Sequence, residues 1–146
     1  MKTWYECSVR YRKTDGDGVQ KVVTEAYLVD ALSFTEAEAR INEEIKAYIS
    51  EEFKVTNIKV TNYSETVFDN ESDYWFKAKV SLIAYDEESG KERRTNIYFL
   101  AQANTLDEAY DKIKESMKNT IGDYTIPSVS ETKIMDVFPY VAEEVN

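Results

Sequence analysis

The chain contains no histidine, one cysteine, four glycines and two prolines among its 146 residues. Without histidine, it cannot build Ser-His-Asp or Cys-His catalytic groups, an iron site of two histidines and a carboxylate, or a zinc site with mixed Cys and His ligands. A single cysteine, Cys7, excludes an intrachain disulfide and a zinc site of four thiolates. The glycines form neither a Gly-x-Gly-x-x-Gly loop nor a Gly-Lys-Ser/Thr loop, so the familiar dinucleotide and ATP phosphate cradles are absent. We therefore expect no metal, no cofactor and no enzymatic activity, although an enzyme that uses only carboxylates and tyrosines stays open.

Long apolar runs are also missing. The first twelve residues have no apolar segment of a secretory signal, and no stretch reaches the about 18 apolar residues that a membrane span needs. With the lone cysteine, this predicts a cytoplasmic protein. Hydrophobic residues still make up 42% of the chain and aromatic residues 13%, which is enough for a packed core, and we expect a single domain. The formal net charge of −10 disfavours indiscriminate attraction to nucleic acid or to anionic membranes.

The most informative pattern present is an internal repeat. Residues 31–37 read ALSFTEA and residues 103–109 read ANTLDEA, 72 positions later. In both segments a hydroxyl residue stands three positions before a glutamate, which is the capping box that begins a helix. The apolar pattern around both segments also recurs, and Trp4 aligns with Trp75 at a spacing of 71. We interpret the chain as a duplication.

Hydrophobic periodicity predicts the elements of each repeat. Alternating residues predict strands over 3–12 and 20–31, helical spacing predicts a helix over 35–50, and β-branched residues predict a third strand over 55–67. The second half repeats this β-β-α-β order, with Gly122 as a helix C-cap and a last strand over 125–137. The predicted fold is α+β, with repeats over about 3–70 and 74–140 related by a pseudo-twofold axis. Two helices would cover one face of an antiparallel-rich sheet, which is either continuous or split in two.

The two hairpin loops are rich in acidic residues. Asp15 and Asp17 begin like a calcium loop, but Val19 and Ala26 stand where oxygen ligands are required. We predict a hairpin turn there, and a solvated acidic tip over 86–90.

Two segments resemble a known family. The stretch TEAYLVDALSFTEAEAR over 24–40 and the ending IMDVFPY over 134–140 are similar to a domain-of-unknown-function family of small Bacteroidetes and phage proteins. The resemblance covers most of the chain and implies a bacterial or phage origin and a cytoplasmic location. That family has no established activity or functional residues, so it names no function.

Strand alternation predicts an interaction face. Side chains on the sheet face opposite the helices would mix aromatic, apolar and basic groups, with the apolar ones as anchors and the basic ones orienting a partner. The predicted face comprises Trp4, Arg10, Arg12, Leu28, Trp75, Lys77, Lys79, Tyr98 and Leu100.

Three functions fit this face and this composition. The leading hypothesis is a non-enzymatic binding or assembly module, which binds a protein partner or self-associates. The first alternative is a protein that binds single-stranded nucleic acid through aromatic and basic side chains. The second is an acidic mimic of nucleic acid that inhibits a host or defence protein. If the sheet instead closes on itself, both tryptophans enter a second core layer. The acidic C-terminal tail, residues 137–146, is either a partner-binding segment or a frayed end.

Overall fold

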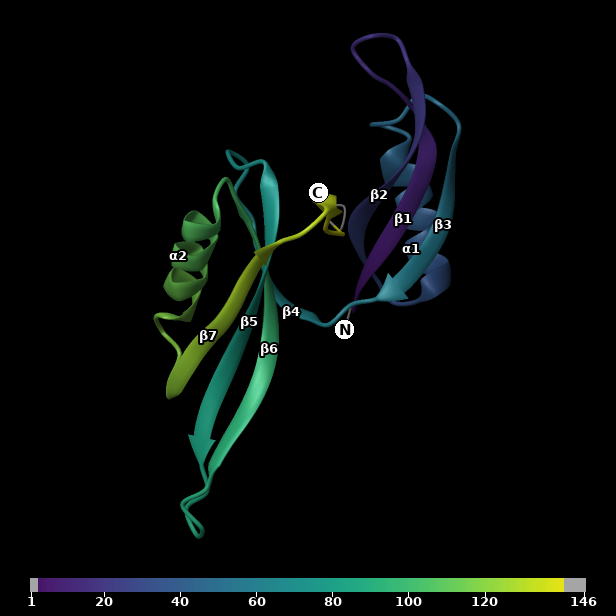
Figure 1. Cartoon of the computed structure of the whole chain (residues 1–146). Helices are drawn as coiled ribbons and strands as arrows, with labels where there is room; N and C mark the ends of the chain where they lie inside the picture. Colours follow the sequence, from purple (N-terminus) through teal and green to yellow (C-terminus); the bar gives the residue numbers. More distant parts are fainter. Residues whose placement is uncertain (1–2, 141–146) are drawn as a thin grey trace, which may run out of the picture. The chain divides into compact units, whose positions relative to one another are not determined.

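A computed structural model describes residues 3–140. The chain forms two compact units (Figure 1). Among the described residues, unit 1 combines residues 3–61 with residues 133–140, and unit 2 comprises Asn62–Thr132. The end of the acidic tail, residues 141–146, lies outside the described residues.

Unit 1 is a four-stranded mixed sheet with one helix. Its sheet order is β3-β1-β2-β8, in which β1 pairs antiparallel with β2 and β3, and β8 pairs parallel with β2. The elements are β1 (Thr3–Thr14), β2 (Gln20–Ala31), α1 (Phe34–Ile45), β3 (Phe53–Val60) and β8 (Ile134–Phe138).

The core of unit 1 lies between α1 and one face of this sheet. Alternate residues of β1 and β2 pack against Ile41 and Ile45 of the helix, and both isoleucines are fully buried. Cys7 belongs to this core, and burial raises the pKa of its thiol to about 12.

Unit 2 is a second four-stranded mixed sheet with one helix. Its order is β4-β6-β5-β7, in which β5 pairs antiparallel with β6 and β7, and β4 pairs parallel with β6. The elements are β4 (Tyr63–Val67), β5 (Tyr74–Tyr85), β6 (Glu92–Ala103), α2 (Leu106–Met117) and β7 (Asp123–Glu131). Ile113 and Met117 of the helix pack on Ala78, Val80 and Phe99 of the strands.

Both helices begin at the predicted caps. The Ser33 and Thr105 hydroxyls accept hydrogen bonds from the backbone N–H groups of Glu36 and Glu108, each at 3.1 Å. The two glutamate carboxylates reach back to the N–H of the residue before each cap, Leu32 and Asn104. The helices end earlier than predicted, at Ile45 and Met117.

The α+β class is confirmed. The sequence allowed either one continuous sheet or two, and the structure has two sheets. Each predicted third strand is two strands, so the described residues hold eight strands rather than six. The breaks fall at Thr61 and Thr132, whose N–H and hydroxyl groups both donate to one carbonyl, of Trp4 and Trp75 respectively, at 2.9 Å. Gly122 is not the predicted helix cap, since Lys118 caps α2 and Gly122 precedes β7 with a φ of 103°.

After each break the chain enters the other unit. β4 follows β3 along the chain but pairs with β6 of unit 2, and β8 follows β7 but pairs with β2 of unit 1. Each unit is therefore completed by a strand from the other half of the sequence, and unit boundaries differ from the predicted repeat boundaries. The duplication itself remains an interpretation.

Candidate functional site

The residues of the predicted face are divided between the two units. Trp4, Arg10, Arg12 and Leu28 belong to β1 and β2 of unit 1, whereas Trp75, Lys77, Lys79, Tyr98 and Leu100 belong to β5 and β6 of unit 2.

Three of the predicted apolar anchors are not available to solvent. Leu28 and Leu100 have no exposed surface and Trp75 is 2% exposed, so the expectation that they form exposed anchors is wrong. β8 and β4 make β2 and β6 interior strands, and the ring of Phe68 meets that of Trp75 edge-on at 5.5 Å between centroids. Trp4 is half-buried, as is Tyr98.

The basic residues of unit 1 line a groove of about 550 Å³. The groove lies where the hairpin of β1 and β2 meets the loop that follows α1 and the start of β3. Its lining comprises Arg10, Tyr11, Arg12, Gln20, Val22, Glu51, Glu52, Phe53 and Lys54.

Two cations of the groove face each other across adjacent strands. Arg10 of β1 and Lys54 of β3 are register partners, and Arg12 follows two residues on, so all three share the sheet face opposite α1. All three are exposed, and none forms an ion pair with another described residue, including Glu51 and Glu52 of the same groove. Like charges that stand directly opposite each other destabilise a sheet. Folding alone therefore gives no reason for this arrangement.

The corresponding positions of unit 2 carry no charge. Ser81 and Thr125 are the register partners at the places of Arg10 and Lys54, and Ile83 stands at the place of Arg12. The Ser81 hydroxyl bonds to Asn96 Oδ1 at 2.7 Å. The same strand arrangement therefore forms with neutral side chains.

Unit 2 instead places a cation among tyrosine rings. Lys77 Nζ lies 5.0 Å from the ring centre of Tyr98 and 5.8 Å from that of Tyr63, within the range of cation–π attraction. Lys77 and Lys79 are half-buried, and the two tyrosine rings stabilise the charge of Lys77. Its availability to a partner is thus lower than that of Arg10 or Arg12.

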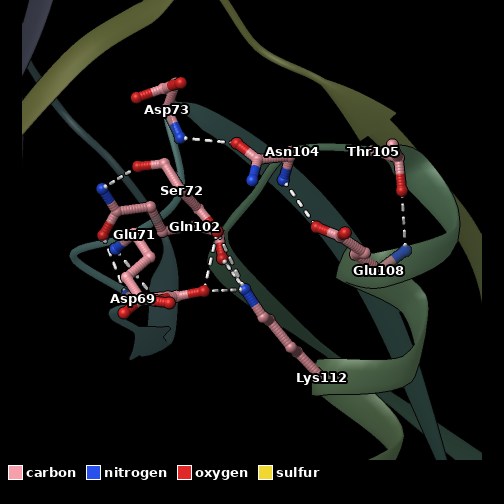
Figure 2. A network of polar contacts seen from close by, with 9 residues as sticks. All are labelled: Asp69, Glu71, Ser72, Asp73, Gln102, Asn104, Thr105, Glu108 and Lys112. Carbon is pink, nitrogen blue, oxygen red and sulfur yellow. Dashed lines mark hydrogen bonds and ion pairs between the residues drawn. The ribbon is translucent and has the colours of Figure 1, made fainter.

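A polar network in unit 2 holds the segment that follows β4 (Figure 2). Lys112 of α2 donates to Asp69 Oδ2 at 2.6 Å, to the Ser72 hydroxyl at 3.2 Å and to the carbonyl oxygen of Gln102 at 2.8 Å. The Gln102 amide bonds to the backbone N–H of Asp69 and to the carbonyl of Ser72. Hydrogen bonds from Lys112 and Ser72 lower the pKa of Asp69 to about 2. Lys112, Asp69, Ser72 and Gln102 are all hydrogen-bonded within the chain, which assigns the network to structure.

Unit 1 has a matching arrangement around Arg40, 72 positions before Lys112. Arg40 donates to the carbonyl of Asp30, to Asp30 Oδ1 at 2.6 Å and to the carbonyl of Phe138 at 3.1 Å. Asp30 Oδ1 also accepts from the backbone N–H of Tyr140 at 2.6 Å. Arg40 therefore holds β8 as Lys112 holds the end of β4.

The acidic hairpin loops are turns. Asp15 Oδ1 accepts hydrogen bonds from the backbone N–H groups of Asp17 and Val19, each at 2.9 Å, and Asp86 Oδ1 accepts from Glu88 and Ser89. These Asp-centred turns are the structure predicted for residues 15–18. Residues 3–140 hold no group of three acidic or thiol side chains arranged for a metal ion.

The family can now be given. A family model described as a domain of unknown function, DUF4494, matches residues 3–140. The chain belongs to this family. No curated protein and no solved structure matches it significantly. No helix in the described range is long and apolar enough to cross a membrane. The family brings no activity with it, so the functional inference depends on the side chains.

Sequence reasoning found Arg10 and Arg12 but missed Lys54 and the acidic residues of the groove. Lys54 lies one residue before the predicted start of the third strand, so alternation along that strand does not assign it to a face. Its pairing with Arg10 depends on a bulge at Thr56, where the register of β1 and β3 shifts. A bulge has no reliable sequence signal. The Lys112 and Arg40 networks were missed because each joins three separate segments of the chain.

Proposed function

We propose that the chain is a non-enzymatic binding module whose groove at Arg10, Arg12 and Lys54 holds an acidic segment of a partner protein. The observation that carries this proposal is the pairing of Arg10 with Lys54 across adjacent strands, without an ion pair to any described carboxylate. A bound carboxylate between these side chains would turn a like-charge repulsion into two charge-assisted hydrogen bonds. The neutral pair Ser81 and Thr125 of unit 2 supports a role outside folding.

The rest of the lining favours a peptide over nucleic acid. Val22 is 51% exposed and is the register partner of Arg12, so the groove offers apolar surface as well as charge on the face that carries the cations. Glu51 and Glu52 would repel a continuous phosphate backbone, as would the net charge of −10. A peptide can place an acidic residue at the cations and a neutral or basic residue beside the glutamates. Mixed charge therefore points to a protein segment.

The origin and location of the protein are expectations from the family resemblance. We expect a bacterial or phage protein that works in the cytoplasm. The alternative of an acidic nucleic-acid mimic has only the net charge of −10 in its favour. Separately, Lys77 and Lys79 of unit 2 are half-buried and do not form a second anion-binding site.

Fluorescence anisotropy tests the proposal. The probe is a fluorescein-labelled peptide of alternating Glu and Leu, compared with its Lys-Leu counterpart and with labelled oligo-dT at several salt concentrations. We expect salt-dependent binding of the Glu-Leu peptide and an about tenfold or greater loss of affinity in an Arg10→Ser, Lys54→Thr variant, since charge-assisted hydrogen bonds contribute about 1.5–3 kcal/mol each.

A matched control removes the same charge elsewhere. Lys46→Ser with Lys118→Ser deletes two exposed lysines that lie just after α1 and α2, each beside a glutamate. This variant should bind as the wild type does. Equal loss in both variants, or absence of peptide binding, would overturn the proposal, and binding of oligo-dT at the same residues would assign the groove to nucleic acid instead.

A further inference from the structure

Unit 1 is completed by a strand that reaches it from the far end of the sequence. β8 begins at Ile134 and pairs with β2, but the element before it, β7, belongs to unit 2. Only Thr132 and Lys133 connect β7 to β8. The position of β8 is therefore determined by its contacts with unit 1 and not by local folding with its sequence neighbours.

Four residues of one continuous segment of unit 1, Tyr27, Asp30, Arg40 and Tyr48, contact Phe138 or the Tyr140 N–H. Arg40 and Asp30 bind the Phe138 carbonyl and the Tyr140 N–H. The Phe138 ring stacks on Tyr27 at 5.9 Å and meets Tyr48 at 5.5 Å. Backbone pairing with β2 adds the ladder from Ala26 to Val29.

None of these contacts requires that β8 come from the same molecule. The slot is made by residues 26–48, and an identical β8 from a second copy would make the same hydrogen bonds and ring contacts. A β8 from the same chain has only the advantage of its linker. A short linker gives the strand an effective concentration of about mM at its binding slot. Protein concentration therefore decides whether β8 of the same chain or β8 of a second copy occupies the slot.

The connection before β8 suits an exchange. Thr132 is fixed to unit 2 by its two hydrogen bonds to the Trp75 carbonyl, whereas Lys133 is exposed. Rotation at Lys133 redirects β8 without disturbing β7. A strand released from β2 leaves a row of backbone donors and acceptors and an exposed Phe138 on both copies, which drives pairing between them.

We propose that two copies of the chain exchange β8, so that the β8 of each copy completes the unit 1 sheet of the other. The partner is a second copy of this chain, and the interface is the β2 edge together with Arg40, Asp30 and Tyr48. This inference is independent of the groove at Arg10, which lies on β1 and β3.

Disulfide trapping tests the exchange on the full chain. In a Cys7→Ala background, which places at position 7 the alanine that unit 2 has at Ala78, one chain carries Ala26→Cys and a second, mass-tagged chain carries Ile134→Cys. Ala26 and Ile134 are register partners of the β2–β8 pair, the spacing that a disulfide needs. The two chains are mixed, unfolded, refolded at about mM concentration and oxidised.

We expect a covalent heterodimer at about tenfold or more the yield of a control in which the tagged chain carries Met135→Cys, because Met135 is exposed and has no register partner on β2. Light scattering should show a dimer-to-monomer ratio that rises in proportion to protein concentration. Deletion of Lys133 should raise this ratio, and a four-residue Gly-Ser insertion there should lower it. A dimer without the Ala26–Ile134 heterodisulfide, or a monomer at every concentration, would overturn the proposal.

Discussion

Units 1 and 2 share their framework and differ on the sheet face opposite the helix. Both have the strand order of an outer parallel strand, a hairpin and a bulged edge strand, and a cation at equivalent positions, Arg40 or Lys112, fixes the end of the parallel strand. On the outer face, unit 1 presents Arg10 beside Lys54 where unit 2 has Ser81 beside Thr125. We therefore interpret the shared features as those that folding needs, and we propose that the charged pair is an addition that the fold does not require.

The largest expected effects come from the shared cores. Ile41 and Ile113 occupy the same position of α1 and α2 and are fully buried, so Ile41→Ala and Ile113→Ala should each lower the free energy of unfolding by about 2–5 kcal/mol. Urea unfolding measures the loss. A cost below that range for one of the two would show that the cores are not equivalent.

Labelling of Cys7 separates the two units in this experiment. The chain has one cysteine, and it is buried in unit 1, so its labelling by a thiol reagent reports opening of that unit. Ile41→Ala should accelerate labelling more than Ile113→Ala does. Equal acceleration would mean that the two units open together.

A smaller effect is expected at Arg40 and Lys112, the cations that hold the ends of the parallel strands β8 and β4. Arg40→Met leaves Asp30, whose side chain is 16% exposed, without its ion pair, and should cost about 1.5–3 kcal/mol. Lys112→Met should cost less, because the side chains of Lys112 and Asp69 are more exposed. Thermal unfolding ranks the two, with Arg40→Lys as the conservative control. A larger loss of stability in Lys112→Met than in Arg40→Met would contradict the view that Arg40 holds its strand more strongly than Lys112 does.

The smallest effect concerns acid stability. The pKa of Asp69 is lowered from 3.8 to about 2, so the stability that its ionised form contributes is fully present above pH about 4 and is lost as the pH falls through about 2. Asp69→Asn should therefore reduce the dependence of unfolding on pH between about 4 and 2. If wild type and variant lose stability in parallel over this range, Asp69 is not the group responsible.

Local patterns predicted most of the elements. The bounds Gln20–Ala31 and the caps Ser33 and Thr105 agree with the structure because alternation and capping depend on residues close in sequence. These features need no knowledge of distant contacts.

The predictions that were wrong concern features that depend on distant contacts. Nothing near Thr61 or Thr132 in the sequence indicates that the next strand joins another sheet, because the β-branched pattern continues across both breaks. Leu28 and Leu100 lie in strands that pair with β8 and β4, segments from the opposite half of the chain, and alternation within β2 and β6 does not show that both leucines are buried. Arg10 and Arg12 were correctly placed on β1, but their partner Lys54 required the register of β3.

The central claim is that the pairing of Arg10 with Lys54 serves binding and not folding. The most direct measurement is the free energy of unfolding of the Arg10→Ser, Lys54→Thr variant, which gives unit 1 the residues of unit 2. We predict a stability equal to the wild type or higher by up to about 1 kcal/mol, since like charges across strands are removed, together with the loss of peptide binding. A clear loss of stability would contradict the claim, because it would show that the two cations contribute to the fold.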